Sequence, residues 1–358
     1  MKNRRGFLGQ TAAIGISAAI GRPVAGMCQR AGVHGPSTHV VQTVLGALDA
    51  SKLGCTLSHE HVSDGPYFLN KWPKGGRVDF TSQTVIGLKR ARAAGISTIV
   101  DLTPYDVGRD IRFLEEVSRK SGIHMIASTG QRFFPPQYAG VTMPSRTIEG
   151  LAEFFSREIL RGIDDTNTKA GVIKIGIVAK EPAELEITGL RAGVRASRAT
   201  GMPLRIHARA ADRAADNLVA ILNDEGANPS RVSFDHSDDS GDLDYFLGLV
   251  KRGYSLGMDH VHRGLMPDAK TSFERRAECI KLLIDEGFAK NLFLSQDVEF
   301  GGSLLSEEAK DFRSKLDPPE GLLFTTRKLV PHLRQIGVSD QDIRVMTIEN
   351  PKRFFASA

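Results

Sequence analysis

The chain has 358 residues, of which 41% are hydrophobic and 25% charged, so it can bury a large core in one big domain or two ordinary ones. Its formal net charge is +5, but Lys2, Arg4, Arg5 and Arg22 lie in an amino-terminal stretch without acidic residues, and without these four cations the charge is +1. A nearly neutral body that has no basic run interleaved with aromatic residues offers no electrostatic footprint for nucleic acid.

The amino terminus has the pattern of an export signal. Arg4 and Arg5 precede Phe7 and Leu8, and a glycine-broken apolar stretch follows through Ile20. This pattern resembles a twin-arginine signal and is too short for a stable membrane span. We expect residues 1–34 to be a signal peptide and linker that direct the protein to the periplasm or outside the cell. A frayed amphipathic tail is the alternative.

The remainder, residues 35–358, alternates brief apolar runs with helix-spaced patterns after a hairpin predicted at 40–44 and 47–54. Eight strands are predicted, at 56–61, 97–103, 124–129, 172–178, 204–208, 232–235, 254–259 and 292–297. Eight strand–helix units in one domain indicate an α/β fold of the (β/α)8 TIM barrel type. An open doubly wound sheet would need a glycine-rich phosphate loop after its first strand, and the sequence has none there.

Six polar residues fall near the carboxyl ends of these predicted strands, which meet at one rim of a parallel barrel. They are His59, His61, Lys174, His207, His236 and Asp297. An isolated His-x-His pair is a weak signal, but the equivalent placement of the other four residues strengthens it. Imidazole nitrogen and carboxylate oxygen suit zinc and neighbouring divalent metals. The pattern predicts a site for two divalent metal ions.

Lys174 is unusual because it lies in the otherwise apolar segment 171–176. A buried ammonium without a partner is costly, so it could pair with a carboxylate or reach the rim. Beside two cations a protonated lysine would be repelled, whereas its neutral amine can react with carbon dioxide. The resulting carbamate has two oxygens and could bridge two metals.

Several motifs give the whole chain a resemblance to the bacterial phosphotriesterases of the amidohydrolase superfamily. They are the sequences LSHEH at 57–61, RARAAG at 90–95, GVIK at 171–174, SRV at 230–232, HSDD at 236–239, GMDH at 257–260 and NP at 350–351. The resemblance implies that His59, His61 and Asp297 hold the more buried metal and that His207 and His236 hold the outer one. It also implies that carboxylated Lys174 bridges the two.

The same resemblance implies a reaction in which a hydroxide shared by the two metals is the nucleophile. Asp297 would accept its proton, and His260 and Asp239 would relay that proton to solvent. Zinc is the expected metal, with cobalt, manganese or iron as alternatives. The resemblance also suggests a homodimer, which nothing in the residue pattern tests.

The segments after the strands bear on the substrate. Arg132 stands where the phosphotriesterases have a tryptophan and their lactonase relatives a tyrosine, while Phe133 keeps one aromatic wall. We expect both residues to contact the substrate, with Arg132 binding a carboxylate, a phosphate or a lactone carbonyl. A solvated charge at the rim is the alternative for Arg132. Hydrolysis of a phosphotriester or related ester is the expected reaction, with lactone or carboxylic ester hydrolysis next.

Two other functional classes are weighed against hydrolysis. A mononuclear deaminase of the same barrel superfamily would lack a lysine like Lys174, and a noncatalytic exported metal-binding barrel would tolerate the loss of Asp297 or His260. Two, one or no metal ions per chain would distinguish hydrolase, deaminase and binding module. Among the remaining histidines, His262 and His332 are interpreted as surface residues and His124 as a residue at the start of a strand. Cys55 and Cys279 are interpreted as small apolar residues.

Overall fold

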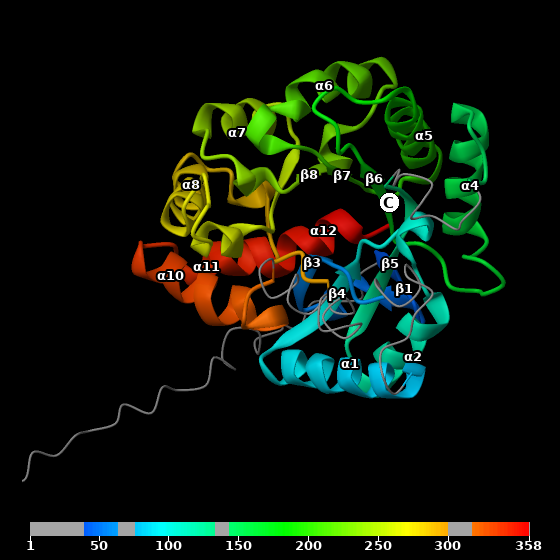
Figure 1. Cartoon of the computed structure of the whole chain (residues 1–358), viewed down its shortest axis with the longest axis horizontal. Helices are drawn as coiled ribbons and strands as arrows, with labels where there is room; N and C mark the ends of the chain where they lie inside the picture. The colour runs from blue at the N-terminus through cyan, green and yellow to red at the C-terminus, as the bar shows by residue number, and fades with distance from the viewer. Residues whose placement is uncertain (1–38, 64–75, 133–142, 300–316, 358) are drawn as a thin grey trace, which may run out of the picture.

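A computed structural model describes residues 39–63, 76–132, 143–299 and 317–357, which form the barrel shown in Figure 1. Its strands are β3 (Cys55–Glu60), β4 (Ile96–Asp101), β5 (His124–Gln131), β6 (Val172–Gly176), β7 (Leu204–His207), β8 (Val232–Asp235), β9 (Ser255–Met258) and β10 (Leu292–Leu294). Each lies within or overlaps a predicted range. Within the described residues the sheet has eight parallel strands, so the predicted α/β barrel is confirmed.

Helices follow the strands, and most of them cover the outside of the sheet. They are α1 (Gly76–Ala93), α2 (Ile111–Ser121), α4 (Ile148–Leu160), α5 (Glu184–Thr200), α6 (Ala214–Asp224), α7 (Leu243–Val250), α8 (Phe273–Asp285), α10 (Val330–Gln335), α11 (Asp340–Arg344) and α12 (Asn350–Phe355). Figure 1 shows α1, α2 and α4 to α8 as a ring around the strands. Helices α2 and α5 end at Gly122 and Gly201, whose φ angles of 74° and 73° are left-handed, as helix-terminating glycines require.

The first and last strands of the sheet meet and close the barrel. The backbone amide of Asp297 donates to the carbonyl of His59 at 3.1 Å, and that of His61 donates to the carbonyl of Val298 at 3.0 Å. Closure by these two bonds therefore brings Asp297 beside His59 and His61, although more than 230 residues separate them in the sequence.

The opposite end of the barrel is closed by apolar side chains. The predicted hairpin is present as antiparallel β1 (Val40–Thr43) and β2 (Gly46–Asp49). Val41 and, from α12, Phe354 and Phe355 pack with the interior residues Val172 and Phe293 in one buried cluster. Fully burying one such side chain stabilises the fold by about 1.5–3 kcal/mol. Because this end of the barrel is apolar, the polar side chains lie toward the other rim.

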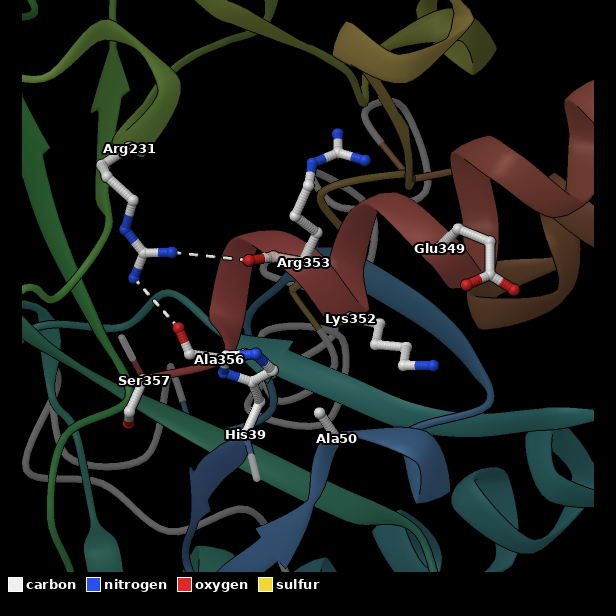
Figure 2. Close-up of a pocket in the computed structure, with 8 residues that line it drawn as sticks. All are labelled: His39, Ala50, Arg231, Glu349, Lys352, Arg353, Ala356 and Ser357. Atoms are coloured by element: carbon white, nitrogen blue, oxygen red, sulfur yellow. Dashed lines mark hydrogen bonds between the residues drawn. The ribbon is translucent and has the colours of Figure 1, made fainter. Parts of the chain in front are cut away.

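A cavity of about 410 Å³ lies beside this closed end, where His39 and residues of α12 meet (Figure 2). Arg231, one of the cations that line it, donates to the backbone carbonyl oxygens of Gly201, Phe354 and Ala356 at 2.7, 2.7 and 3.2 Å. Through these bonds the guanidinium satisfies carbonyl groups at the end of α12 and holds this helix against the barrel.

Some expectations fall outside the described residues or need correction. Residues 1–34 and Phe133 are not described, so the export signal and the aromatic contact stay predictions. None of the helices in the described ranges is long and apolar enough to cross a membrane. The interpretation of His262 as a surface residue is wrong, because it is 4% exposed and its ring lies 5.6 Å from that of Phe324. Cys55 and Cys279 are buried free thiols, as predicted.

Candidate metal centre

The more buried of the two predicted metal sites is assembled where the barrel closes. His59 is the last residue but one of β3, His61 follows the strand, and both are buried. Their Nε2 atoms lie 3.3 and 3.2 Å from Oδ1 of Asp297. Two imidazole nitrogens and one carboxylate oxygen thus converge within 4.8 Å, a spacing that could hold a metal ion.

Other side chains fix the orientation of these two rings. The Nδ1 atom of His59 lies 2.7 Å from Oδ2 of Asp259, and the Nδ1 atom of His61 lies 2.9 Å from Oγ1 of Thr103. A histidine that binds a metal usually engages its second ring nitrogen in this way. We assign the proton to Nδ1 in both rings on these contacts, which leaves each Nε2 free for a metal ion.

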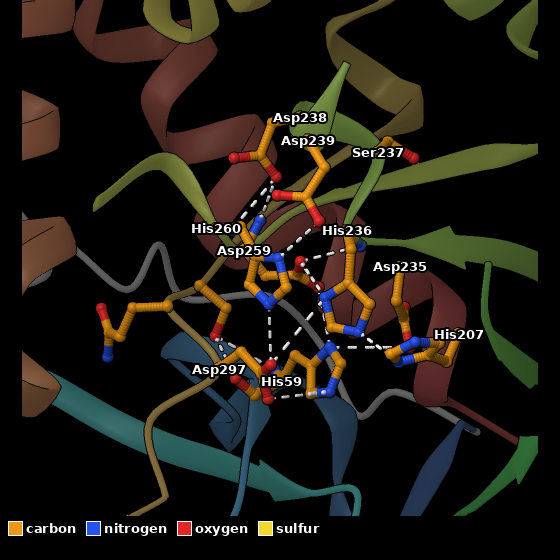
Figure 3. Close-up of polar contacts among 12 residues, drawn as sticks. His59, His207, Asp235, His236, Ser237, Asp238, Asp239, Asp259, His260 and Asp297 are labelled. Carbon is orange, nitrogen blue, oxygen red and sulfur yellow. Dashed lines mark hydrogen bonds and ion pairs between the residues drawn. The ribbon is translucent and has the colours of Figure 1, made fainter. Parts of the chain in front are cut away.

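The predicted outer pair also comes together. The Nε2 atom of His236 lies 2.7 Å from Nδ1 of His207, and its Nδ1 lies 3.0 Å from Oδ1 of Asp259. Asp259 therefore orients one ring of each predicted site with its two oxygens, as Figure 3 shows. Burial, with a further contribution from Asp297, raises the pKa of Asp259 to about 6. Sequence reasoning missed Asp259, although it lies in the quoted segment 257–260.

Three imidazoles of this centre are held neutral. Burial lowers the pKa values of His59, His207 and His236 well below the usual value for histidine. The neighbouring cation or ring adds to the effect, Lys174 for His59 and His236 for His207. Neutral imidazole is the form that coordinates metals, so these rings do not have to lose a proton before they bind one.

Lys174 points into the same centre and pairs with a carboxylate. Its side chain is 2% exposed, its Nζ atom lies 3.3 Å from Nε2 of His59, and it forms an ion pair with Oδ2 of Asp235. Burial lowers the pKa of Lys174, while Asp235 acts in the opposite direction. The other oxygen of Asp235 accepts a 2.6 Å hydrogen bond from Nε of Arg205. Asp235 and Arg205 were not among the residues predicted from the sequence.

The three residues of the predicted proton relay form a continuous chain. Oδ2 of Asp297 lies 2.8 Å from Nε2 of His260, whose Nδ1 lies 2.9 Å from Oδ2 of Asp239. Burial and Arg263 lower the pKa of His260, but Asp239 and Asp297 outweigh them and raise it to about 9. Arg276, 5% exposed, donates to Oδ1 of Asp239 at 2.9 Å and fixes the outer end of this chain.

The backbone is strained at two of the predicted metal ligands. His236 and Asp297 have φ angles of 56° and 49°, in the left-handed region that non-glycine residues rarely adopt. Around Asp297 the buried carboxylate of Glu60 holds this shape, because it accepts from Oγ of Ser295 at 2.6 Å and from the amide of Val298 at 2.9 Å. The kinks turn both ligands toward the centre at the point where each strand ends.

One atom of the centre lacks a partner that the protein could supply. Oδ1 of Asp297 is buried and has no hydrogen-bond partner within the described part of the chain, although it faces the Nε2 atoms of His59 and His61. An orphaned buried carboxylate oxygen is costly. Because a bound cation would remove this cost, the residues present fit a divalent metal.

Two arginines lie near the centre on the side of the rim. Arg132 is half-buried, and its backbone amide donates to the carboxylate of Asp106 at 3.0 and 3.1 Å. Its charge helps to lower the pKa of His207, one member of the outer pair. Arg263, in the 3-10 turn Val261–Leu265, has its NH2 atom 3.6 Å from Oδ2 of Asp297. Sequence reasoning had not identified Arg263.

Comparison with known proteins agrees with this geometry. The sequence model described as "Phosphotriesterase family" matches residues 39–355. The chain belongs to the phosphotriesterase family. The match includes every predicted metal and relay residue, from His59 to Asp297.

Individual relatives within the phosphotriesterase family differ in the reactions that their names describe. The chain is 29% identical to the aryldialkylphosphatase of Saccharolobus solfataricus over 323 residues, which are 87% of this chain and 97% of that protein. It is also 29% identical to a phospho-furanose lactonase of Mycoplasmopsis synoviae, covering 88% and 91% of the two chains. A solved variant of the organophosphorus hydrolase of Deinococcus radiodurans has a TM-score of 0.77 at 27% identity, with 90% and 98% covered.

Proposed function

We propose that this phosphotriesterase family member is a metal-dependent hydrolase that cleaves phosphotriester or related ester bonds. One observation carries the proposal: Oδ1 of Asp297 faces the Nε2 atoms of His59 and His61, while Oδ2 contacts His260. The same carboxylate therefore joins a candidate metal site to an acid–base chain. Such a link is what a hydrolase needs and what a binding module does not.

Two divalent ions, zinc by preference, are the proposed cofactors. The proposed ligands of the inner ion are His59, His61 and Asp297, and those of the outer ion are His207 and His236. Two imidazoles alone leave the outer ion short of a tetrahedral set, so we propose that Lys174 supplies a bridging ligand.

Lys174 would do so as a carbamate. The lone pair of its neutral amine would form a bond to the carbon of CO2, a π pair would move to one oxygen, and the nitrogen would lose one proton to solvent. The product keeps one N–H and carries two oxygens that share one negative charge. Burial, which lowers the pKa of Lys174, favours the neutral amine that this reaction requires.

When bound, the two ions would lower the pKa of a water molecule and polarise the oxygen atom of the bond under attack. The residues of the chain then have a defined task. Asp297 accepts at Oδ2 the proton released during attack. His260, which is protonated in the metal-free protein, first releases its Nδ1 proton toward Asp239 and solvent and then takes the proton of Asp297 at Nε2. Hydrogen bonds of 2.8 and 2.9 Å support this order of transfer.

Arg132 and Arg263 are the proposed contacts for the polar part of the substrate. Arg263 lies within 3.6 Å of the catalytic carboxylate, and its side chain is 29% exposed, so it can reach a bound molecule at the rim. A planar guanidinium suits phosphoryl, carboxylate and lactone carbonyl oxygens. Phe133 is proposed as an aromatic wall from the sequence alone.

Lactone or carboxylic ester hydrolysis is the second candidate. Arg132 occupies the position where the resemblance places an aromatic residue, and the family includes a relative named as a phospho-furanose lactonase. A charged contact in place of an aromatic one favours a smaller and more polar substrate than a bulky aryl phosphotriester. The metal centre itself would serve both reactions.

The test is a turnover screen of the metal-loaded protein against aryl phosphotriesters, lactones and simple esters. The variant Asp297→Asn serves as the control, because an amide cannot accept the proton. We expect turnover of at least one class and a loss of about 100- to 10,000-fold in the variant, the usual contribution of general acid–base catalysis. If Asp297→Asn hydrolysed the substrates as well as the parent, the role of this carboxylate would be wrong.

A further inference from the structure

A layer of buried charges adjoins the candidate metal centre and includes Lys174. Lys174 of β6 and Arg205 of β7 are partners in the strand register, and Asp235 of β8 lies against both. The side chains of Arg205 and Asp235 are fully buried, and that of Lys174 is 2% exposed. Groups of this kind are expensive to bury, so their presence together needs an explanation.

The two oxygens of Asp235 are divided between the two cations. Oδ2 pairs with Nζ of Lys174, and Oδ1 accepts a 2.6 Å hydrogen bond from Nε of Arg205. The strained backbone at His236, with a φ angle of 56°, allows Asp235 to face the interior together with the histidine that follows it. Asp235 is therefore fixed in place from the side that faces away from the lysine.

Arg205 also connects this layer to the rest of the centre. Its NH2 atom lies 3.7 Å from Oδ2 of Asp259, the carboxylate that contacts both His59 and His236. The NH1 and NH2 atoms of Arg205 have no hydrogen-bond partner among the described residues. The guanidinium thus acts through its charge on two carboxylates more than through a full set of hydrogen bonds.

We propose that Asp235 and Arg205 are positioning residues for the carboxylated form of Lys174. Asp235 accepts the single N–H that the carbamate nitrogen retains, which orients the two carbamate oxygens away from Asp235 and toward the metals. Arg205 balances the charge of Asp235, which would otherwise repel the carbamate anion. This inference rests on the proposed function, because it assumes that Lys174 is carboxylated.

The change in the charge of Lys174 on carboxylation explains why both Asp235 and Arg205 are needed. Before carboxylation, the ammonium of protonated Lys174 neutralises Asp235, whereas after carboxylation two anions lie side by side in a buried site. Like charges at this spacing disfavour each other strongly unless cations compensate; the metal ions would offset the carbamate, so Asp235 needs a cation of its own. Arg205 is already bonded to the far oxygen of Asp235, so the compensation persists in both states of the lysine.

The experiment measures the carbamate directly. The metal-free protein is incubated with zinc and increasing ¹³C-bicarbonate, and the ¹³C resonance of the carbamate and the number of zinc ions per chain are recorded. The variants are Arg205→Met, the double variant Asp235→Asn with Arg205→Met, and the double variant Asp235→Ala with Arg205→Met. Arg109→Met is the matched control, because Arg109 forms a buried pair with Glu158 at 2.6 Å outside the centre.

We expect Arg205→Met to raise the bicarbonate concentration for half-maximal carbamate formation by about 10- to 100-fold, since it leaves an anion beside the carbamate. The double variant with Asp235→Asn removes that anion but keeps an acceptor, so it should return to within about threefold of the parent. The double variant with Asp235→Ala lacks the acceptor and should stay about tenfold above the parent. Arg109→Met should form the carbamate as the parent does.

The possible failures can be told apart. Absence of the carbamate signal in the parent protein would contradict the proposed function itself. If Arg205→Met formed the carbamate at the same bicarbonate concentration as the parent, the role of Arg205 would be overturned. Equal behaviour of the two double variants would overturn the role of Asp235 as the acceptor of the carbamate N–H.

Discussion

The contact between His260 and Asp239 predicts how the stability of the metal-free protein depends on pH. His260 is 2% exposed and contacts Asp239 at 2.9 Å and Asp297 at 2.8 Å, and these carboxylates raise its pKa to about 9. An unfolded histidine titrates near about 6.5. The folded state therefore binds the proton more tightly than the unfolded state does, and the contact stabilises the fold only while the ring is protonated.

The magnitude follows from this difference in pKa. A shift from 6.5 to about 9 corresponds to about 3 kcal/mol in the free energy of unfolding. Because the folded pKa is raised, this stabilisation is fully present below pH 6.5 and is lost as the pH rises through about 9. In His260→Gln the contribution is absent at every pH. The parent and the variant should differ by about 3 kcal/mol more at about pH 6 than at about pH 10.

Urea denaturation of both metal-free proteins across this pH range measures the difference. His124→Gln is the control, because burial, with Arg92 and Lys52, lowers the pKa of half-buried His124. The pKa shift of His124 has the opposite sign to that of His260. The unfolded state binds the proton more tightly, so the native His124 lowers the stability of the fold as the pH falls below about 6.5. A pH-independent difference between the parent and His260→Gln would refute the reasoning about the Asp239–His260–Asp297 chain.

Three further predictions concern the same centre. Asp239→Asn should lower kcat by about 100-fold, since the relay loses its outer carboxylate, and an unchanged kcat in steady-state assays would remove Asp239 from the mechanism. Asp259→Asn should weaken zinc binding by about 10- to 100-fold, because Asp259 orients rings at both sites. Competition with a chelator measures the zinc affinity, and equal affinities of the parent and the variant would contradict this role of Asp259. Removing the metal should lower the melting temperature, and zinc at about 100 times its dissociation constant should restore about 2.7 kcal/mol; a melting temperature that is insensitive to zinc would exclude binding to the folded state.

The barrel and the gathering of the predicted ligands could both be predicted from the sequence. Short apolar runs separated by helix-spaced segments indicated eight strands, and the parallel arrangement brought their carboxyl ends to one rim. His59 and His61 face the same way because side chains alternate along a strand. Asp297 joins them because β3 and β10 are the two edges that close the sheet, which follows from the order of the strands.

The charges that adjoin the centre could not be predicted by the same rules. If alternation held along β8, a residue before an inward-facing His236 would point outward, so Asp235 was not considered. The left-handed backbone at His236 breaks that alternation. Arg205 and Asp259 were missed because a sequence pattern does not reveal which polar side chains contact a ligand from behind. His262 was misplaced because Phe324, which covers it, lies 62 residues later.

The most direct test of the account is the metal content of the purified protein after equilibration with zinc and bicarbonate. The convergence of His59, His61 and Asp297, together with the contact between His207 and His236, predicts two zinc ions per chain. A value of one, or the absence of bound zinc, would contradict the paired centre on which the proposed reaction depends.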